Sequence, residues 1–168
     1  MPRERKTPAD HVLSRFFEPG SIAVIGSFKD GFFGGHVIVK SLLKAGYKGK
    51  IFPVNPAYKE VHGLQVYPSL EEVPEEVDLA VVMINARSVA GMVRECAGKG
   101  VRAMIVVSDG FAERDEEGAR LQEELLKVAG GEGIRIIGPN TAGVVNTSNG
   151  FNPCAYEAGY YRIRKGPI

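Results

Sequence analysis

The residues best suited to chemistry lie in one glycine-rich stretch, residues 21–35, which reads SIAVIGSFKDGFFGG. Its apolar run IAVI ends at Gly26, as expected of a buried parallel strand, and a helical pattern begins after Gly34 and Gly35. A strand, a glycine loop and a helix together present backbone N–H groups and a positive helix end to a phosphate. The stretch therefore predicts a phosphate-binding loop, although its spacing differs from the G-x-G-x-x-G typical of dinucleotide-binding proteins.

Polar and basic side chains near this loop favour a phosphorylated nucleotide as the ligand. Ser27 would add a hydroxyl donor to the N–H groups of the loop. Lys29, Lys59 and Arg87 lie on or beside predicted strand-end loops and together could contact a second phosphate. Each of these cations alone is more simply explained as a solvated surface residue. Asp109, at another strand end, either orients an amide or hydroxyl of the ligand or caps its own turn.

The end of the second predicted strand argues against NAD. In NAD-binding proteins of Rossmann type a carboxylate near this point binds the ribose hydroxyls. Asn55 and Pro56 occupy these positions here. An NAD(P)-binding domain therefore stays an alternative only if Lys59 or Arg87 binds a 2′-phosphate.

Catalysis by this chain alone has little support in the sequence. His11, His36 and His62 are predicted to lie in segments that cannot easily converge with a nucleophile, and His36 is expected in the first turn of a helix. The chain contains neither a G-x-S-x-G elbow nor a G-x-x-x-x-G-K-[ST] loop. Cys96 shares an apolar helix face with its neighbours, which indicates a core position. We therefore predict no catalytic and no metal-binding residue.

Strand and helix patterns alternate along the chain with short connections. This alternation predicts an α/β fold, a Rossmann-like doubly wound and mainly parallel five-stranded sheet with helices on both faces. Ligands of such sheets bind in the loops at the carboxyl ends of the strands. The predicted strands are residues 22–25, 50–54, 78–84, 101–107 and 134–137, and the main helices are residues 36–45, 89–99 and 115–129.

The helix ends can also be predicted. Thr7 followed by Pro8 and Asp10 indicates the start of a short helix over residues 11–17, which would bury Val12, Leu13, Phe16 and Phe17. Ser88 is a typical N-cap for the helix that follows it. Residues 130–131, both glycine, are expected to end the last helix, and residues 61–68 form an extended excursion.

Composition limits the classes of partner. A chain of 168 residues suits one domain, and its 21 basic and 20 acidic residues leave a net charge of +1, so we expect neither nucleic acid nor a membrane as partner. The two cysteines form no C-x-x-C pair, which favours a reducing cytoplasm. The polar amino terminus lacks the apolar segment of a signal peptide, and no apolar run approaches the roughly 20 residues that span a bilayer.

Five motifs, in this order along the chain, resemble a known family: FFEPGSIAVIGSFKD, GKIFPVNP, GLQVYPSLEEVPEEVDLAVV, GVRAMIVVSDGF and GIRIIGPNTAGVVN. The chain resembles the coenzyme A-binding domain of the ADP-forming acyl-CoA synthetases, which are related to the α subunit of succinyl-CoA synthetase. The resemblance covers residues 13–168. It implies a domain that binds coenzyme A (CoA). The strand-end loops themselves already indicate Gly26, Gly35 and Lys59 as contact residues.

The resemblance also implies roles for individual positions. Residues 27–30 (Ser27, Phe28, Lys29 and Asp30) match the family's phosphate loop, and Asn55 and Pro56 match the segment near the adenosine and its 3′-phosphate. The remaining positions match the segment along the nucleotide (Ile84, Asn85 and Ala86), the loop along the pantetheine arm (Val107, Ser108 and Asp109) and the motif near the thioester (Asn140 and Thr141). Three positions depart from the family: Ala57 stands where lysine is frequent, Asn85 where proline is usual and Thr141 where cysteine is common.

The resemblance implies that the chain is the CoA-binding module of an ADP-forming acyl-CoA synthetase. Its ligand would be CoA or acyl-CoA, and its partners the remaining domains or subunit, which carry the phosphorylated histidine and the ATP-grasp fold. On this interpretation residues 1–20 are a lead with a short helix, residues 21–150 the Rossmann-like domain and residues 151–168 a tail toward a second domain. A stand-alone CoA-binding or regulatory protein is the main alternative.

Overall fold

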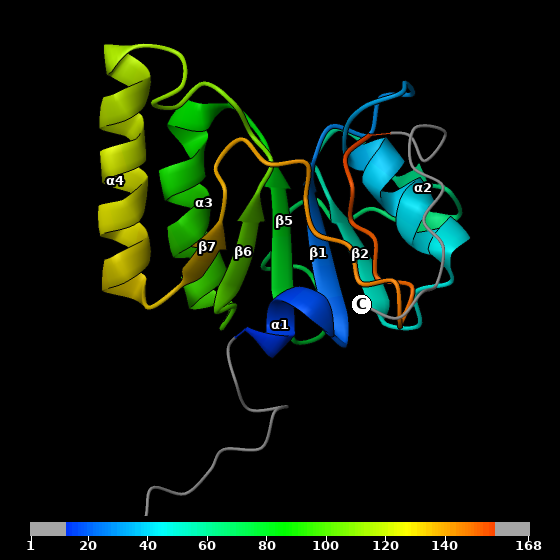
Figure 1. Cartoon of the computed structure of the whole chain (residues 1–168). Helices are drawn as coiled ribbons and strands as arrows, with labels where there is room; N and C mark the ends of the chain where they lie inside the picture. The colour runs from blue at the N-terminus through cyan, green and yellow to red at the C-terminus, as the bar shows by residue number, and fades with distance from the viewer. Residues whose placement is uncertain (1–12, 157–168) are drawn as a thin grey trace, which may run out of the picture.

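The computed structural model of the chain describes residues 13–156 and is centred on a five-stranded parallel sheet (Figure 1). The strands lie in the order β2-β1-β5-β6-β7, and every neighbouring pair is parallel. In this order the winding reverses between β1 and β5, and ligands of open α/β sheets bind at such a switch point. The strands are β1 (Ser21–Gly26), β2 (Lys50–Val54), β5 (Leu79–Met83), β6 (Ala103–Val106) and β7 (Arg135–Ile137).

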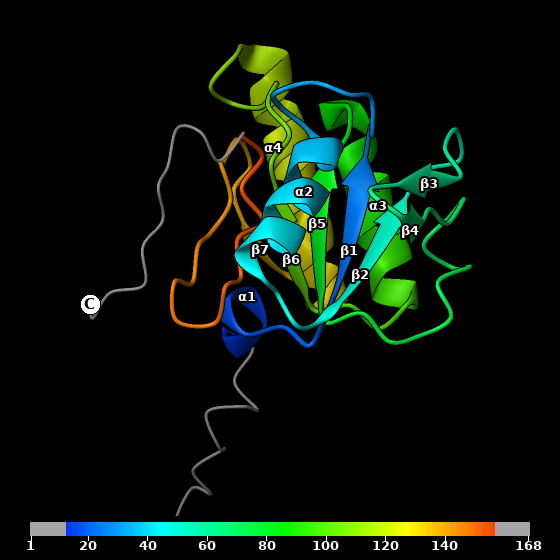
Figure 2. The same ribbon diagram turned by 90° about the vertical axis from the view of Figure 1, so that its right-hand side faces the viewer.

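Helices cover both faces of the sheet, as Figures 1 and 2 show. The helix α2 (Gly35–Ala45) lies on one face, and α3 (Ala86–Gly98) and α4 (Glu116–Glu132) lie together on the other. The single-turn helix α1 (Ser14–Phe17) lies at the edge where the strands begin. The predicted doubly wound α/β fold is therefore confirmed.

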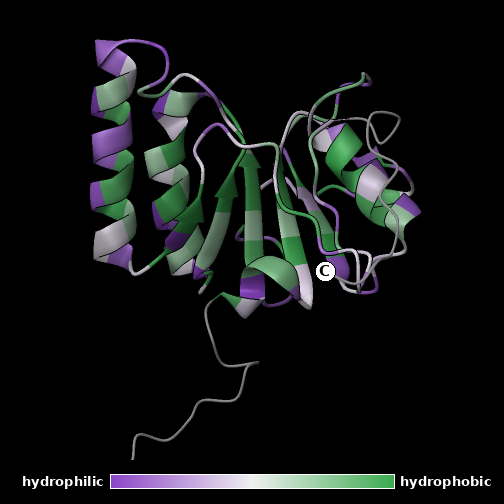
Figure 3. Ribbon diagram, in the orientation of Figure 1, coloured by the Kyte–Doolittle hydropathy of each residue, from purple (hydrophilic) through white to green (hydrophobic). Residues whose placement is uncertain are grey.

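The core consists of two apolar clusters, one on each face of the sheet. In β1, Ala23 and Ile25 belong to the cluster under α3 and α4, whereas Ile22 and Val24 belong to the cluster under α2. Alternate side chains of a strand point to opposite faces, so a strand covered on both faces must be apolar throughout. Figure 3 shows this as hydrophobic colouring along the central strands.

Two of the predicted helix ends are wrong. The N-cap of α3 is Asn85 and not Ser88, because β5 ends at Met83 and the side chain of Asn85 accepts a hydrogen bond from the backbone N–H of Arg87 at 3.0 Å. The helix α4 continues through its two glycines to Glu132. It ends at Gly133, which adopts the left-handed conformation (φ 69°) that closes a helix.

The amino-terminal helix differs from the prediction in what it buries. Phe16 is 1% exposed and packs into the cluster under α2, but Leu13 is 49% and Phe17 43% exposed. A single helical turn has one buried side, so the expected burial of all its apolar residues is wrong. The predicted start at Thr7, Pro8 and Asp10, and Val12, lie outside the described residues.

A small antiparallel hairpin, β3 (Glu60–Val61) with β4 (Leu64–Gln65), follows β2. It forms the extended excursion that the sequence predicts and projects beside β2 (Figure 2). Within residues 13–156 no helix combines the length and the apolar character needed to cross a membrane.

Candidate functional site

A cavity of about 690 Å³ runs along the carboxyl ends of the strands. Every strand of the parallel sheet contributes the residues that follow it, and two aromatic side chains complete the wall. The lining residues are Gly26, Ser27, Phe33, Asn55, Met83, Ile84, Asn85, Val107, Ser108, Asp109, Asn140, Thr141, Ala142 and Tyr156.

The loop between β1 and α2 forms one wall of this cavity and is held from the side of β2. The Asn55 side-chain amide donates to the carbonyl oxygen of Gly26 at 2.8 Å. Ser27 Oγ and the Tyr58 hydroxyl lie 3.1 Å apart, and the backbone N–H of Lys29 donates to Ser27 Oγ at 3.3 Å. The hydroxyl of Ser27 is therefore fixed at the exposed start of the loop.

The first turn of α2 follows the same loop and carries no side-chain cap. Its N-cap is Gly34, with a φ of 120°, and no acidic residue lies in its first turn. A Cβ on the next residue, Gly35, would lie 2.8 Å from the carbonyl oxygen of Ser27. Glycines thus bring the loop close to the helix and leave the helix end without a competing side chain. Such a helix end offers backbone N–H groups and a partial positive charge to an anion.

The opposite wall is built from the loops after β5, β6 and β7. Ser108 is buried (4% exposed), and its Oγ accepts a hydrogen bond from the backbone N–H of Ile84 at 3.0 Å. The backbone N–H of Asn140 donates to the carbonyl oxygen of Ser108 at 2.9 Å. Ser108 therefore ties three strand ends together, and its hydroxyl holds the protein's own backbone in place.

Comparisons with known proteins decide the family. A family model described as a CoA binding domain matches residues 20–147. The chain belongs to the family of CoA binding domains. The family resemblance predicted from the five sequence motifs is therefore confirmed.

The relatives of this CoA-binding domain are much longer proteins. It is 44% identical over 139 residues to an ADP-forming acetate–CoA ligase II of Archaeoglobus fulgidus, which covers 83% of this chain and 21% of the relative. It is 41% identical over 141 residues to the α subunit of an ADP-forming acetate–CoA ligase II of Pyrococcus furiosus, covering 84% and 31%. The chain thus spans only about a fifth to a third of the length of these relatives.

A solved structure also matches this chain over part of its own length. The apo form of a dinucleotide-forming acetyl-coenzyme A synthetase 1 of Ca. Korarchaeum cryptofilum matches with a TM-score of 0.79 and 37% identity. The match covers 84% of this chain and 31% of the synthetase chain. Sequence and fold therefore agree that this CoA-binding domain corresponds to one part of such synthetases.

The structure brings most of the predicted site residues of the CoA-binding domain into one cavity. The predicted residues that line it are Gly26, Ser27, Asn55, Ile84, Asn85, Val107, Ser108, Asp109, Asn140 and Thr141. Phe33, Met83, Ala142 and Tyr156 also line it and were not predicted from the sequence. For Phe33, the available sequence signal was a pair of consecutive phenylalanines directly before Gly34, inside the predicted phosphate loop. Nothing in the sequence connects Tyr156 with the glycine loop.

The other predicted site residues lie outside the cavity wall. Phe28 is 5% exposed and packs into the cluster under α2, so its side chain belongs to the core. Gly35 supports the loop from within the first turn of α2. Four further predicted residues are exposed: Lys29, Asp30, Pro56 and Lys59. Ala86 lines a second, smaller cavity.

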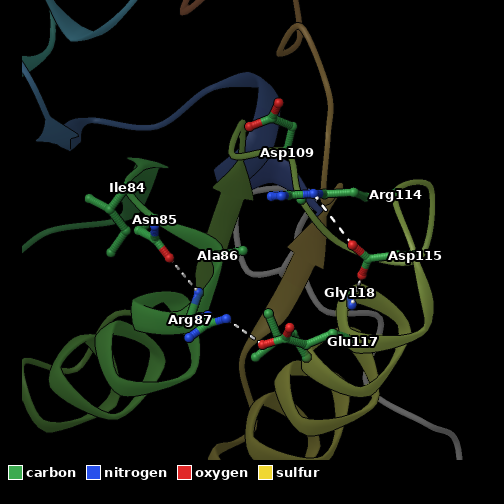
Figure 4. Close-up of a pocket in the computed structure, with 11 residues that line it drawn as sticks. Ile84, Asn85, Ala86, Arg87, Asp109, Arg114, Asp115, Glu117 and Gly118 are labelled. Carbon is green, nitrogen blue, oxygen red and sulfur yellow. Dashed lines mark hydrogen bonds and ion pairs between the residues drawn. The ribbon is translucent and has the colours of Figure 1, made fainter.

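That second cavity, of about 180 Å³, lies between the amino-terminal ends of α3 and α4 (Figure 4). Four of the charged side chains that line it form two pairs: Arg87 Nη2 lies 2.5 Å from Glu117 Oε1, and Arg114 Nε lies 3.5 Å from Asp115 Oδ2. Arg87, which the sequence suggested as a phosphate contact, thus binds a carboxylate of the protein instead.

Two of the histidines contact each other, which the sequence did not predict. The rings of His36 and His62 have centroids 4.2 Å apart, and His36 Nε2 lies 3.0 Å from Asp30 Oδ1. Cys96 is fully buried, and burial, with a smaller effect of nearby Glu95, raises the pKa of its thiol to about 12. The predicted core position of Cys96 is confirmed. In the described part of the chain no group of His, Cys, Asp and Glu side chains is arranged to hold a metal ion.

Proposed function

We propose that this chain binds CoA or an acyl-CoA in the cavity along the strand ends, as the CoA-binding module of an ADP-forming acyl-CoA synthetase. The observation that carries the proposal is the α2 end without a side-chain cap, in a member of the CoA-binding family. This helix end directly follows the loop whose residues Gly26, Ser27 and Phe33 line the cavity along the five strand ends. The backbone N–H groups of the first turn of α2, with Ser27, would bind the diphosphate of the ligand.

The charges around the cavity favour one orientation of the ligand. Lys29 and Lys59 are exposed beside the β1 and β2 ends, whereas residues 138–142, after β7, carry no charged side chain. Asp109, at the β6 end, adds a carboxylate that repels phosphate. The nucleotide and its 3′-phosphate would therefore lie near Asn55 and Lys59, and the arm that ends in the thiol near Asn140 and Thr141.

The complete enzyme would convert an acyl-CoA, ADP and phosphate to the acid, CoA and ATP, reversibly. The other domains or a second subunit would supply the phosphorylated histidine and the ATP-grasp part. The cavity described here would contribute binding and orientation of CoA. We expect this chain alone to bind the ligand without turnover.

Titration calorimetry of the folded domain with CoA, dephospho-CoA and NAD tests the proposal. We expect CoA to bind, and dephospho-CoA to bind more weakly because it lacks the 3′-phosphate. Binding of NAD alone, or of none of the three, would contradict the proposal.

A lysine substitution locates the 3′-phosphate. Lys59→Ala should weaken CoA binding about tenfold and leave dephospho-CoA binding unchanged, because one charge-assisted contact is lost. The matched control is Lys127→Ala, which removes the same charge from an exposed position on α4. Equal losses for CoA and dephospho-CoA would place Lys59 away from the 3′-phosphate.

A further inference from the structure

Two aromatic side chains form a part of the cavity wall that the proposed phosphate contacts do not use. The rings of Phe33 and Tyr156 have centroids 4.8 Å apart and are tilted by 45°. Both line the cavity, and both are partly open to solvent, with 39% and 44% of their surface exposed. Large apolar side chains left open on a cavity wall are typical of ligand-binding surfaces.

The backbone holds this pair in place. Phe33 and Tyr156 form an isolated antiparallel bridge, and the backbone N–H of Gly34 donates to the carbonyl oxygen of Ala155 at 3.1 Å. Figure 1 shows the segment after β7 crossing back past the strand ends toward the side of α2. The aromatic pair therefore joins the glycine loop to the end of the described chain.

The pair lies beside the loop after β7. The backbone N–H of Ala155 donates to the carbonyl oxygen of Ala142 at 3.2 Å, and Ala142 follows Asn140 and Thr141 on the cavity wall. This part of the wall is neutral, because residues 138–142 read GPNTA. A neutral, partly apolar part of a ligand suits it better than a phosphate does.

We propose that Phe33 and Tyr156 form the contact surface for the neutral arm of the ligand, the pantetheine chain together with an apolar acyl group on its sulfur. The inference rests on the proposed function, since it names the part of an acyl-CoA that each end of the cavity binds. Covering the two exposed rings with an aliphatic chain removes apolar surface of both partners from water. The pair then favours acyl-CoA ligands with apolar acyl groups over free CoA.

The test compares three ligands in calorimetric titrations: CoA, butyryl-CoA and adenosine 3′,5′-bisphosphate, which keeps the 3′-phosphorylated nucleotide but lacks the arm. Phe33→Ala and Tyr156→Ala should each weaken CoA about fivefold and butyryl-CoA about tenfold, and should change bisphosphate binding by less than about twofold. Tyr156→Phe keeps the ring and should bind all three ligands like the wild type.

Phe32→Ala is the matched control. Phe32 precedes Phe33 in the same loop but is 73% exposed and does not line the cavity, so its removal should leave all three affinities unchanged. Equal weakening of CoA and the bisphosphate by Phe33→Ala would overturn the inference, because the pair would then support only the phosphate loop. Unchanged binding of all three ligands would overturn it as well. If wild-type protein binds neither CoA nor butyryl-CoA, the proposed function itself fails.

Discussion

The amino-terminal ends of α2 and α4 lie near the same edge of the sheet, but only α4 is capped by a side chain. At α4 the carboxylate of Asp115 accepts a hydrogen bond from the backbone N–H of Gly118 at 2.8 Å, and Glu116 and Glu117 add negative charge to the first turn. At α2 the N-cap is Gly34, which provides no capping side chain, and the first turn contains no acidic residue. The first turn of α4 is thus capped by a side chain of the protein, whereas the first turn of α2 has no side-chain cap.

On the proposed function, this difference in capping explains why the ligand would occupy the larger of the two neighbouring cavities. In the smaller cavity the charges of Arg87 and Glu117 neutralise each other, and the acidic first turn of α4 would repel a phosphate. Beside the larger cavity, the first turn of α2 contains no acidic residue, and the carboxylate of Asp30 in the preceding loop lies 3.0 Å from His36 Nε2. On the proposed function, the α2 end binds an anion because its cap supplies no side chain, and substitutions at Gly35 and Asp115 can break the comparison.

The largest effect is expected for Gly35→Ala. The new Cβ would lie 2.8 Å from the carbonyl oxygen of Ser27 and 3.0 Å from Cε1 of Phe28, so the loop must move away from the helix. Because the diphosphate needs the loop and the helix end together, we expect CoA affinity to fall at least about thirtyfold. Calorimetric titration measures the loss, and a thermal melt checks that the variant is folded.

Gly91→Ala is the matched control for this substitution. Gly91 lies inside α3, and a Cβ there would meet no atom within 4 Å. Alanine should therefore stabilise the protein by roughly 0.5–1 kcal/mol, the ordinary gain in helix propensity, without a change in CoA affinity. Wild-type affinity in the Gly35→Ala variant would contradict the role given to the α2 end.

A smaller effect is expected at the amino-terminal end of α4, which Asp115 caps. Asp115→Ala removes the cap of α4 and should lower the free energy of unfolding by about 1 kcal/mol, because the N–H of Gly118 loses its partner. CoA affinity should stay within about twofold of wild type. Chemical denaturation and calorimetric titration measure the two quantities, and a loss of affinity without a loss of stability would reverse the assignment of the two helix ends.

Most of the fold could be predicted from the sequence because the strands are buried on both faces. A continuous apolar run such as that in β1 or β5 admits few other interpretations, and the predicted strands overlap the observed ones. The helix ends were harder to predict. Asn85 and Ser88 are both good N-caps, and only the length of the connection after β5 decides between them.

The sequence predicts the site residues that directly follow strand ends. It does not predict residues that contacts between segments far apart in the sequence bring to the cavity. The cavity positions of Asn55, Ser108 and Asn140 follow from the order of the elements, because parallel strands end at one edge. Tyr156 reaches the cavity only because the segment after β7 folds back onto the glycine loop. A side chain brought in by such a return leaves no periodic signal in the sequence.

The smallest effect is expected at Glu113, in the loop before α4. Desolvation acts to raise the pKa of this carboxyl, but hydrogen bonds from the backbone N–H groups of Phe111, Glu113 itself and Gly110 hold it below its ordinary value of 4.5. The folded state therefore favours the ionised form. The resulting stabilisation is complete above the ordinary pKa and is lost as the pH falls through the lower pKa of the folded protein.

Glu113→Gln should accordingly lower stability at neutral pH and remove this component of the acid sensitivity. The side chain is exposed and screened by solvent, so the expected difference from wild type is about 0.5 kcal/mol or less. Denaturation midpoints measured from pH 7 downward should converge for the two proteins at acid pH, whereas Glu124→Gln, a charge-matched change on α4, should show no comparable convergence. Parallel curves for wild type and Glu113→Gln would mean that the loop before α4 is held by hydrogen-bond geometry alone. The charge of Glu113 would then contribute nothing to the stability of that loop.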